Sequence, residues 1–225
     1  MTTPMDVALE AGPKGKRIVA YAPDWPGLER GAKTEEAALE RLQAYRPRYA
    51  PVAALAGMTD EFAASGALDI TDRYPGTGST DFWGISFAFS PHDQQPMTEA
   101  ELERELALMQ ASWAFFDDVR GRVSPALRRG PRGGGKDRDQ IVWHTTATEM
   151  DWGKSLGLPG MPDAMPDEAA LQQHRADYVA AFREFHAQGK RAGKSPLRFL
   201  IRHTAFHTLD HAWEMEDKDL TGEQG

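Results

Sequence analysis

The sequence contains no cysteine among its 225 residues. Disulfide bonds, thiolate ligands for a metal ion and a cysteine nucleophile are therefore excluded. A reaction that needs a thiol would have to take it from a separate small molecule.

Long apolar runs are missing as well. No stretch of about 18 apolar residues occurs, so no transmembrane helix is expected. Residues 1–16 contain prolines, glycines and acidic residues but lack the apolar segment of a secretory signal. The expected location is cytoplasmic, with no membrane partner.

Basic residues are fewer than acidic ones. The chain has 26 Lys and Arg and 34 Asp and Glu, which gives a formal net charge of −8. A binder of nucleic acid that relies on a basic surface is therefore not expected. Apolar residues make up 40% of the chain and charged residues 27%, which is enough for a packed core. At this length the chain could form one large domain or two small ones.

The N-terminal part predicts a small α+β unit over residues 17–90, preceded by a flexible arm at residues 1–16. Its first strand is the β-prone run at 17–21. A helix follows from Thr34, a good N-cap with two glutamates behind it. Pro47 and Pro51 are expected to end that helix.

Two further strands are expected at 67–74 and 80–87, around the turn-rich PGTGS sequence at 75–79. The resulting order is β-α-β-β. A linker follows at about residues 90–97.

The rest of the chain shows helical periodicity. Thr98 and Glu101 form a capping-box pattern at the start of the first helix, and Ser195 with Pro196 is expected to start the last. The four predicted helices cover about 99–121, 137–157, 167–188 and 195–218. They predict an up-and-down four-helix bundle over residues 91–218, followed by a polar tail at 219–225. The whole chain is thus assigned to the α+β class.

Three histidines lie on one stripe of the last predicted helix: His203, His207 and His211. Two histidines one helical turn apart can bind one metal ion. His203 and His211 are roughly 12 Å apart along the axis, so all three cannot share an ion. Spacing alone leaves open whether the pair is His203/His207 or His207/His211.

A third ligand would have to come from another helix. His144 lies on the inward face of the helix at 137–157, together with Ile141 and Thr148. Three histidines with one open position are typical of a catalytic metal site, since structural sites usually have four protein ligands. The aromatic Trp143, Trp152 and Trp213 are expected in the core.

Two segments extend this interpretation: GPRGGGKDRDQIVWH at 130–144 and AFHTLDHAWEMED at 205–217. They and their spacing resemble the DinB superfamily, the DinB/YfiT-like four-helix-bundle metalloenzymes, over residues 98–218. The resemblance implies a metal bound by His144, His207 and His211. It leaves His203 as a neighbour that lines the pocket or is exposed.

The resemblance also implies a divalent metal, zinc or nickel first, with iron and manganese as alternatives. Asp210 or Glu214 could hold the second nitrogen of a ligand imidazole, and both could equally be ordinary surface charges. The N-terminal sequence VAYAPDWPGLERGAKTEEAALERLQAY at 19–45 resembles the HicB-like α/β fold.

The loop before the second bundle helix is rich in glycine and basic residues and could bind an anion. It lacks the P-loop pattern, so nucleotide hydrolysis is not indicated. A solvated loop is the alternative. The residues concerned are Arg132, Gly133, Gly134, Gly135 and Arg138.

Three functions follow as hypotheses. DinB-like relatives include enzymes that transfer bacillithiol, mycothiol or glutathione to a small-molecule electrophile, and the missing cysteine agrees with an external thiol. A metal-dependent hydrolase is the second hypothesis. A non-catalytic stress-response or partner-binding protein with a structural metal is the third. An enzyme predicts a pocket at the histidines, a partner-binding protein predicts an exposed apolar patch in the first 90 residues, and the resemblance allows a homodimer.

Overall fold

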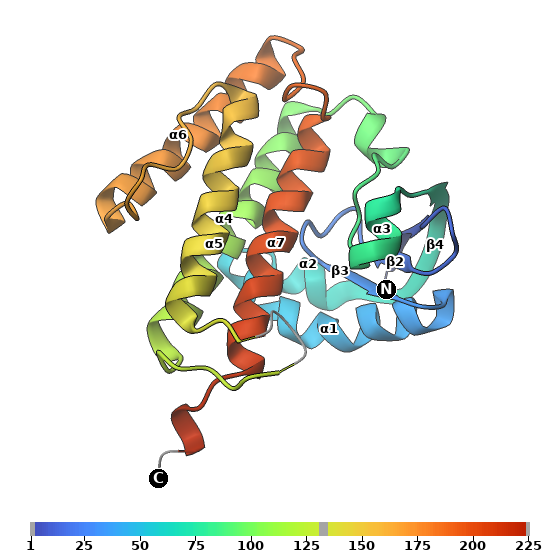
Figure 1. Cartoon of the computed structure of the whole chain (residues 1–225). Coiled ribbons are helices and arrows are strands. Elements are labelled where there is room, and N and C mark those ends of the chain that lie inside the picture. Colours follow the sequence, from blue (N-terminus) through green and yellow to red (C-terminus); the bar gives the residue numbers. More distant parts are fainter. Residues whose placement is uncertain (1–2, 131–134, 224–225) are drawn as a thin grey trace.

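The computed structural model describes residues 3–130 and 135–223. Within them the chain is an α+β structure with one four-stranded mixed sheet and seven α-helices (Figure 1). The predicted fold class is confirmed at this level.

The sheet has the strand order β3-β2-β1-β4. Its strands are β1 (Thr3–Ala11), β2 (Ile18–Tyr21), β3 (Glu29–Ala32) and β4 (Ser65–Pro75). The pairs β1–β2 and β2–β3 are antiparallel and β1–β4 is parallel. Three strands therefore precede the first helix, in place of the single strand expected from the sequence.

The flexible arm expected at residues 1–16 is wrong for residues 3–11, which form an inner strand of the sheet. Met5, Val7 and Leu9 point into the main core and Ala8 into a smaller cluster on the other face. Met5, Val7 and Leu9 alternate with Asp6, Ala8 and Glu10, the period-two pattern of a strand, so the signal for this strand was present in the sequence.

Helix α1 (Glu35–Leu55) begins after Thr34, whose side chain accepts the backbone N–H of Ala37 as predicted. The expected end at Pro47 and Pro51 is wrong, because both prolines lie inside the helix. A proline in a helix costs about 3 kcal/mol. Burial offsets this, since each fully buried large apolar side chain contributes about 1.5–3 kcal/mol, and fully buried Tyr49 is one of several on this helix.

The strand expected at 80–87 is also wrong. Residues Gly78–Trp83 form the short helix α3, and Gly84 ends it with φ of 70°. Thr77 and Thr80 make a reciprocal capping box at its start. These local hydrogen bonds override the β propensity of the aromatic residues.

The four helices predicted in the second half are all present. They are α4 (Glu99–Arg122), α5 (Arg138–Gly153), α6 (Glu168–Ala187) and α7 (Leu197–Asp217). The capping box of Thr98 and Glu101 is confirmed. Helix α7 begins after Pro196 rather than after Ser195, and no side chain caps it.

Shorter elements complete the chain. Helix α2 (Thr59–Ala64) connects α1 to β4. Single 3₁₀ turns lie at His92–Gln94, Lys154–Leu156 and Thr221–Glu223. The expected linker at 90–97 and the expected tail at 219–225 thus each include one such turn.

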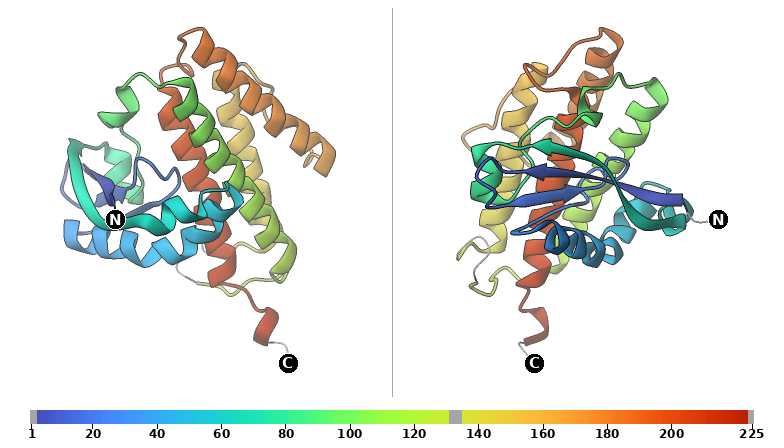
Figure 2. Two further views of the ribbon diagram at one scale, coloured as in Figure 1. Left: turned by 180° about the vertical axis from the view of Figure 1, so that it is seen from behind. Right: turned by 90° about the vertical axis from the view of Figure 1, so that its right-hand side faces the viewer.

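The sheet and α1 pack beside α4 and α7, as both views of Figure 2 show. One buried cluster contains residues of both the sheet unit and the helices. Val7 and Tyr49 come from the sheet unit with α1, and Phe115, Leu209 and Trp213 come from α4 and α7. The predicted units at 17–90 and 91–218 therefore share a core. The other side of α7 faces α5 and carries the histidines.

No helix in the described part of the chain is long and apolar enough to cross a membrane.

Candidate metal centre

His144, His207 and His211 come together between α5 and α7. One nitrogen from each ring lies within 4.8 Å of the other two. The ring centroids are 5.2 Å apart for His144 and His207, 5.0 Å for His144 and His211, and 4.6 Å for His207 and His211. The cluster joins residues more than sixty positions apart in the chain.

Two local features position these side chains. The four-residue spacing of His207 and His211 puts both on one face of α7. The start of α5 is held by a capping box in which Asp137 and Gln140 each accept the other's backbone N–H, at 2.8 and 3.0 Å. This fixes His144 two turns into α5, opposite the pair on α7.

The arrangement fits a metal ion. Bonds of about 2.0–2.1 Å to zinc would place three imidazole nitrogens roughly 3.3–3.4 Å apart in a tetrahedral site. The three nitrogens lie within 4.8 Å of one another, so small side-chain rotations are enough to reach this spacing. Three neutral nitrogen donors with a fourth position open are typical of catalytic sites for zinc or a similar divalent ion.

The electrostatics favour the neutral rings that a metal requires. Burial lowers the pKa of His207 well below its ordinary value, and the neighbouring histidines lower it further. Burial also lowers the pKa of His144, with contributions from His211 and Lys136. Neither ring therefore has to lose a proton at neutral pH before it can bind a cation.

Glu214 holds His211. Its Oε2 lies 2.9 Å from Nδ1 of His211, and its Oε1 accepts the Nζ of Lys218 at 2.6 Å. Burial would raise the pKa of this carboxyl, but the two hydrogen bonds outweigh burial and lower the pKa to about 2. Because a carboxylate only accepts, Nδ1 carries the proton and Nε2 of His211 offers a lone pair.

Asp210, the other carboxylate considered for this role, contacts Arg30 instead. Its Oδ1 lies 3.3 Å from Nη1 of Arg30, on the strand β3. The guanidinium of Arg30 stacks on Tyr45 and Trp213, at 3.5 and 4.4 Å from the ring centroids. Asp210 thus joins α7 to the sheet, on the next face of the helix from the cluster.

His203 is buried among aromatic rings rather than exposed. It stacks on Phe199 with an interplanar angle of 16° and contacts Phe87 and Trp152. Its Nδ1 is buried without a hydrogen-bond partner. Burial, followed by the charge of Arg202, lowers its pKa to about 3. It lies one turn from His207 and outside the group of three.

Of the loop proposed to bind an anion, Arg132, Gly133 and Gly134 lie outside the described residues. Gly135 is exposed. Arg138 donates from Nε to Asp139 at 2.8 Å.

The three tryptophans expected in the core lie in three different environments. Trp213 is fully buried, as expected. Trp152 contacts both His203 and His207, so it forms part of the wall of the site. Trp143 is 52% exposed, which contradicts the expected core position. It lines a hollow of about 480 Å³ together with His144. The sequence did contain a signal for this position, because Trp143 directly precedes His144 on the same predicted helix.

No protein-family model, curated protein or solved structure matches the chain. The likeness to the DinB superfamily therefore remains a resemblance in sequence motifs.

Proposed function

We propose that this protein is a metal-dependent enzyme in which His144, His207 and His211 bind one divalent cation. A low-molecular-weight thiol would occupy the open position and be transferred to an electrophilic small molecule. The arrangement of α4–α7 would then be that of a DinB-like bundle, and the expected cytoplasmic location is retained.

The observation that carries the proposal is the convergence of three imidazoles from two helices within 4.8 Å. Two of the rings have lowered pKa values, and the third is held by a carboxylate. Converging neutral imidazoles, one of them oriented by a carboxylate, are typical of a ligand set for a divalent cation.

The chemistry divides between the cation and the chain. A bound divalent cation supplies positive charge that favours the thiolate form of a thiol. The chain positions the ligands: Glu214 fixes the proton on His211, and Trp152 covers one side of His207. The thiolate sulfur would form a bond to the electrophilic carbon, and the leaving group would depart with the bonding electron pair.

The test is the metal content of protein purified without a histidine tag, for the wild type and for His144→Ala and His207→Ala. We expect close to one metal ion per chain in the wild type and loss in both variants. His186→Ala is the control, because His186 lies on α6 and contacts the backbone oxygen of Met97. A wild type that neither contains metal nor takes up zinc or nickel would disprove the proposal.

A second function, partner binding, is favoured by an exposed aromatic pair in the first 90 residues. Phe82 and Trp83 on α3 are 72% and 64% exposed, and their rings touch with centroids 4.5 Å apart. Large apolar side chains rarely stand together on a surface without a partner. A second copy of the chain is the simplest partner.

Light scattering coupled to size-exclusion chromatography tests this. If the pair forms a dimer interface, Phe82→Ser/Trp83→Ser will convert a dimer to a monomer and leave the metal content unchanged. A wild type that stays monomeric at high concentration would remove the dimer hypothesis.

A further inference from the structure

The hollow beside His144 provides a place for the part of a ligand that the metal does not bind. It has a volume of about 480 Å³ and is lined by residues from the start of α5 and the segment before it. The lining residues are Lys136, Asp137, Asp139, Gln140, Trp143 and His144. Because His144 belongs to both, the hollow and the histidine cluster adjoin.

Of the three charged side chains that line this hollow, two already have partners within the described part of the protein and one does not. Asp137 accepts the backbone N–H of Gln140 as the helix cap, at 2.8 Å, and Asp139 accepts from Arg138 at 2.8 Å. Lys136 makes no hydrogen bond or ion pair with any residue in the described ranges. The two carboxylates are therefore engaged, whereas the ammonium group of Lys136 is available to a ligand.

Lys136 also acts electrostatically on the histidines. Its charge contributes to the lowered pKa of both His144 and His207. Lys136 and His144 line the same hollow, so the positive charge of Lys136 lies beside the histidine cluster.

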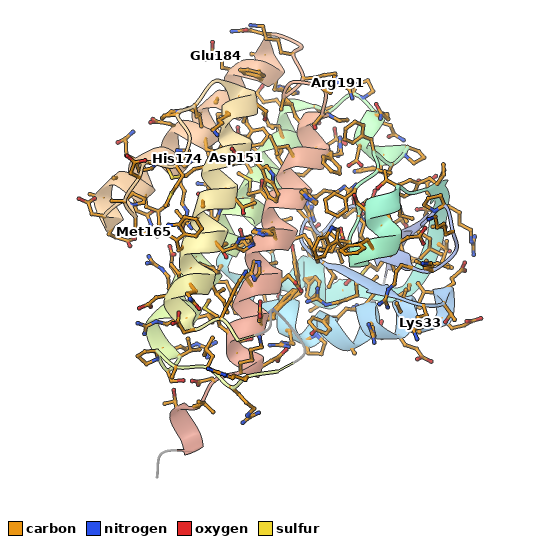
Figure 3. The ribbon with its side chains drawn as sticks, in the orientation of Figure 1. Lys33, Asp151, Met165, His174, Glu184 and Arg191 are labelled. Carbon is orange, nitrogen blue, oxygen red and sulfur yellow. The ribbon has the colours of Figure 1, made fainter. Side chains whose placement is uncertain are left out.

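Trp143 supplies the apolar part of the hollow. More than half of its surface is exposed, one residue before a metal-ligand candidate. On its other side it borders a second hollow with Met165, which Figure 3 labels at the outer side of α5. An indole with this exposure gains stability when an apolar ligand covers it.

From these features we infer that the hollow at His144 binds an anionic group of the substrate or thiol, with Lys136 as its counter-ion and Trp143 as the apolar wall. The inference rests on the proposed function, because the ligand is placed by the metal at its other end. It names the ligand class: a thiol or substrate with an acidic group joined to the reactive atom by an apolar chain.

The experiment uses full-length protein with Co²⁺ in place of the natural metal. Two probes of equal length are titrated, anionic 4-mercaptobutanoate and neutral 4-mercaptobutan-1-ol. Binding is followed by the thiolate-to-cobalt charge-transfer absorption. The ratio of the two dissociation constants is compared between variants, so that intrinsic differences between the thiols cancel.

We expect Lys136→Gln to reduce the preference for the anionic thiol about threefold to fivefold, the range of a half-exposed ion pair. Lys136→Arg should retain the preference, and high salt should reduce it in the wild type. Lys154→Gln is the matched control, because Lys154 follows the other end of α5 and pairs with Asp151. Trp143→Ala should weaken both thiols about threefold or more and leave the ratio unchanged.

The outcomes separate the two proposals. If Co²⁺ and both thiols bind but the ratio is the same in Lys136→Gln and the wild type, the inference is overturned and the metal site stands. If Co²⁺ is not taken up, or neither thiol produces the absorption band, the proposed thiol transfer fails and the inference fails with it.

Discussion

At the scale of single residues, Asp210 and Glu214 lie one helical turn apart on α7 and have different partners. Glu214 contacts His211, whereas Asp210 contacts Arg30 on β3. The two carboxylates lie four residues apart, and both adjoin the histidine pair in sequence. Only the positions of their partners in space distinguish them.

We therefore predict that Glu214→Gln weakens metal binding about tenfold to a hundredfold, the usual effect of removing a carboxylate that orients a ligand histidine. Asp210→Asn should leave the affinity within about twofold of the wild type. Competition titration with a chelator dye measures both. Equal affinities for the two variants would contradict the role of Glu214, and circular dichroism checks that both are folded.

His203 provides a second prediction at this scale. Its pKa of about 3 in the folded protein lies below the ordinary value of about 6.5 in the unfolded chain. The unfolded chain therefore binds the proton more readily, and stability falls as the pH decreases from about 6.5 toward 3. Between pH 7 and pH 5 this loss is on the order of 2 kcal/mol.

His203→Phe removes the titrating ring and keeps the aromatic stack. We expect this variant to lose about 2 kcal/mol less than the wild type between pH 7 and pH 5, measured by urea unfolding. At pH 7 its metal content should equal that of the wild type, since His203 lies outside the group of three. Loss of metal in this variant would contradict the assignment of ligands.

At the scale of elements, α7 is connected to the segment before α4 by a buried ion pair. Arg202 donates to both oxygens of Asp93, at 2.9 and 2.7 Å. It also donates to Ser86 and to the backbone oxygen of Ala88. Asp93 is 2% exposed and Arg202 3%. The pair thus sets how the segment at 86–93 lies against the histidine-bearing helix.

We predict that Arg202→Leu lowers the free energy of unfolding by about 3–5 kcal/mol, because it leaves Asp93 buried without its charge partner. Arg183→Leu is the control: its pair with Glu103 is about half exposed on both sides, and its loss should cost about 0.2–1 kcal/mol. Urea unfolding measures both. Similar losses in the two variants would show that burial does not strengthen the dependence on the pair.

At the scale of the whole molecule, the sheet unit and the helices depend on each other. Trp213 and Leu209 of α7 lie in the same buried cluster as Val7 and Tyr49. Separating the parts would expose apolar surface on both. The three clustered histidines lie on α5 and α7, and α7 packs between α5 on one side and the sheet unit on the other.

A chain that begins at residue 91 should therefore fail to unfold cooperatively, and residues 1–90 alone should fail as well. Heteronuclear NMR spectra of each fragment should show narrow dispersion. Mixing the fragments should restore dispersed signals if the shared core is sufficient. A well-dispersed spectrum from residues 91–225 alone would show that the helices fold without the sheet.

The sequence by itself determined the features that depend on neighbours along the chain. The four long helices follow from apolar periodicity, and Thr34 and Thr98 cap helices as predicted because a cap is a contact over three residues. The spacing of His207 and His211 predicted a pair on one helix face. The choice of His144 as their partner came from a family resemblance and an inward-facing position.

Only the tertiary structure decided the rest. Residues 3–11 take the inner position between β2 and β4, and α1 continues through Pro47 because its buried face offsets the lost hydrogen bond. The same holds for Glu214, which contacts His211, and for Lys136 and Trp143 beside His144. Such contacts depend on how separate elements pack, and burial energies of several kcal/mol outweigh the local preferences that a sequence displays.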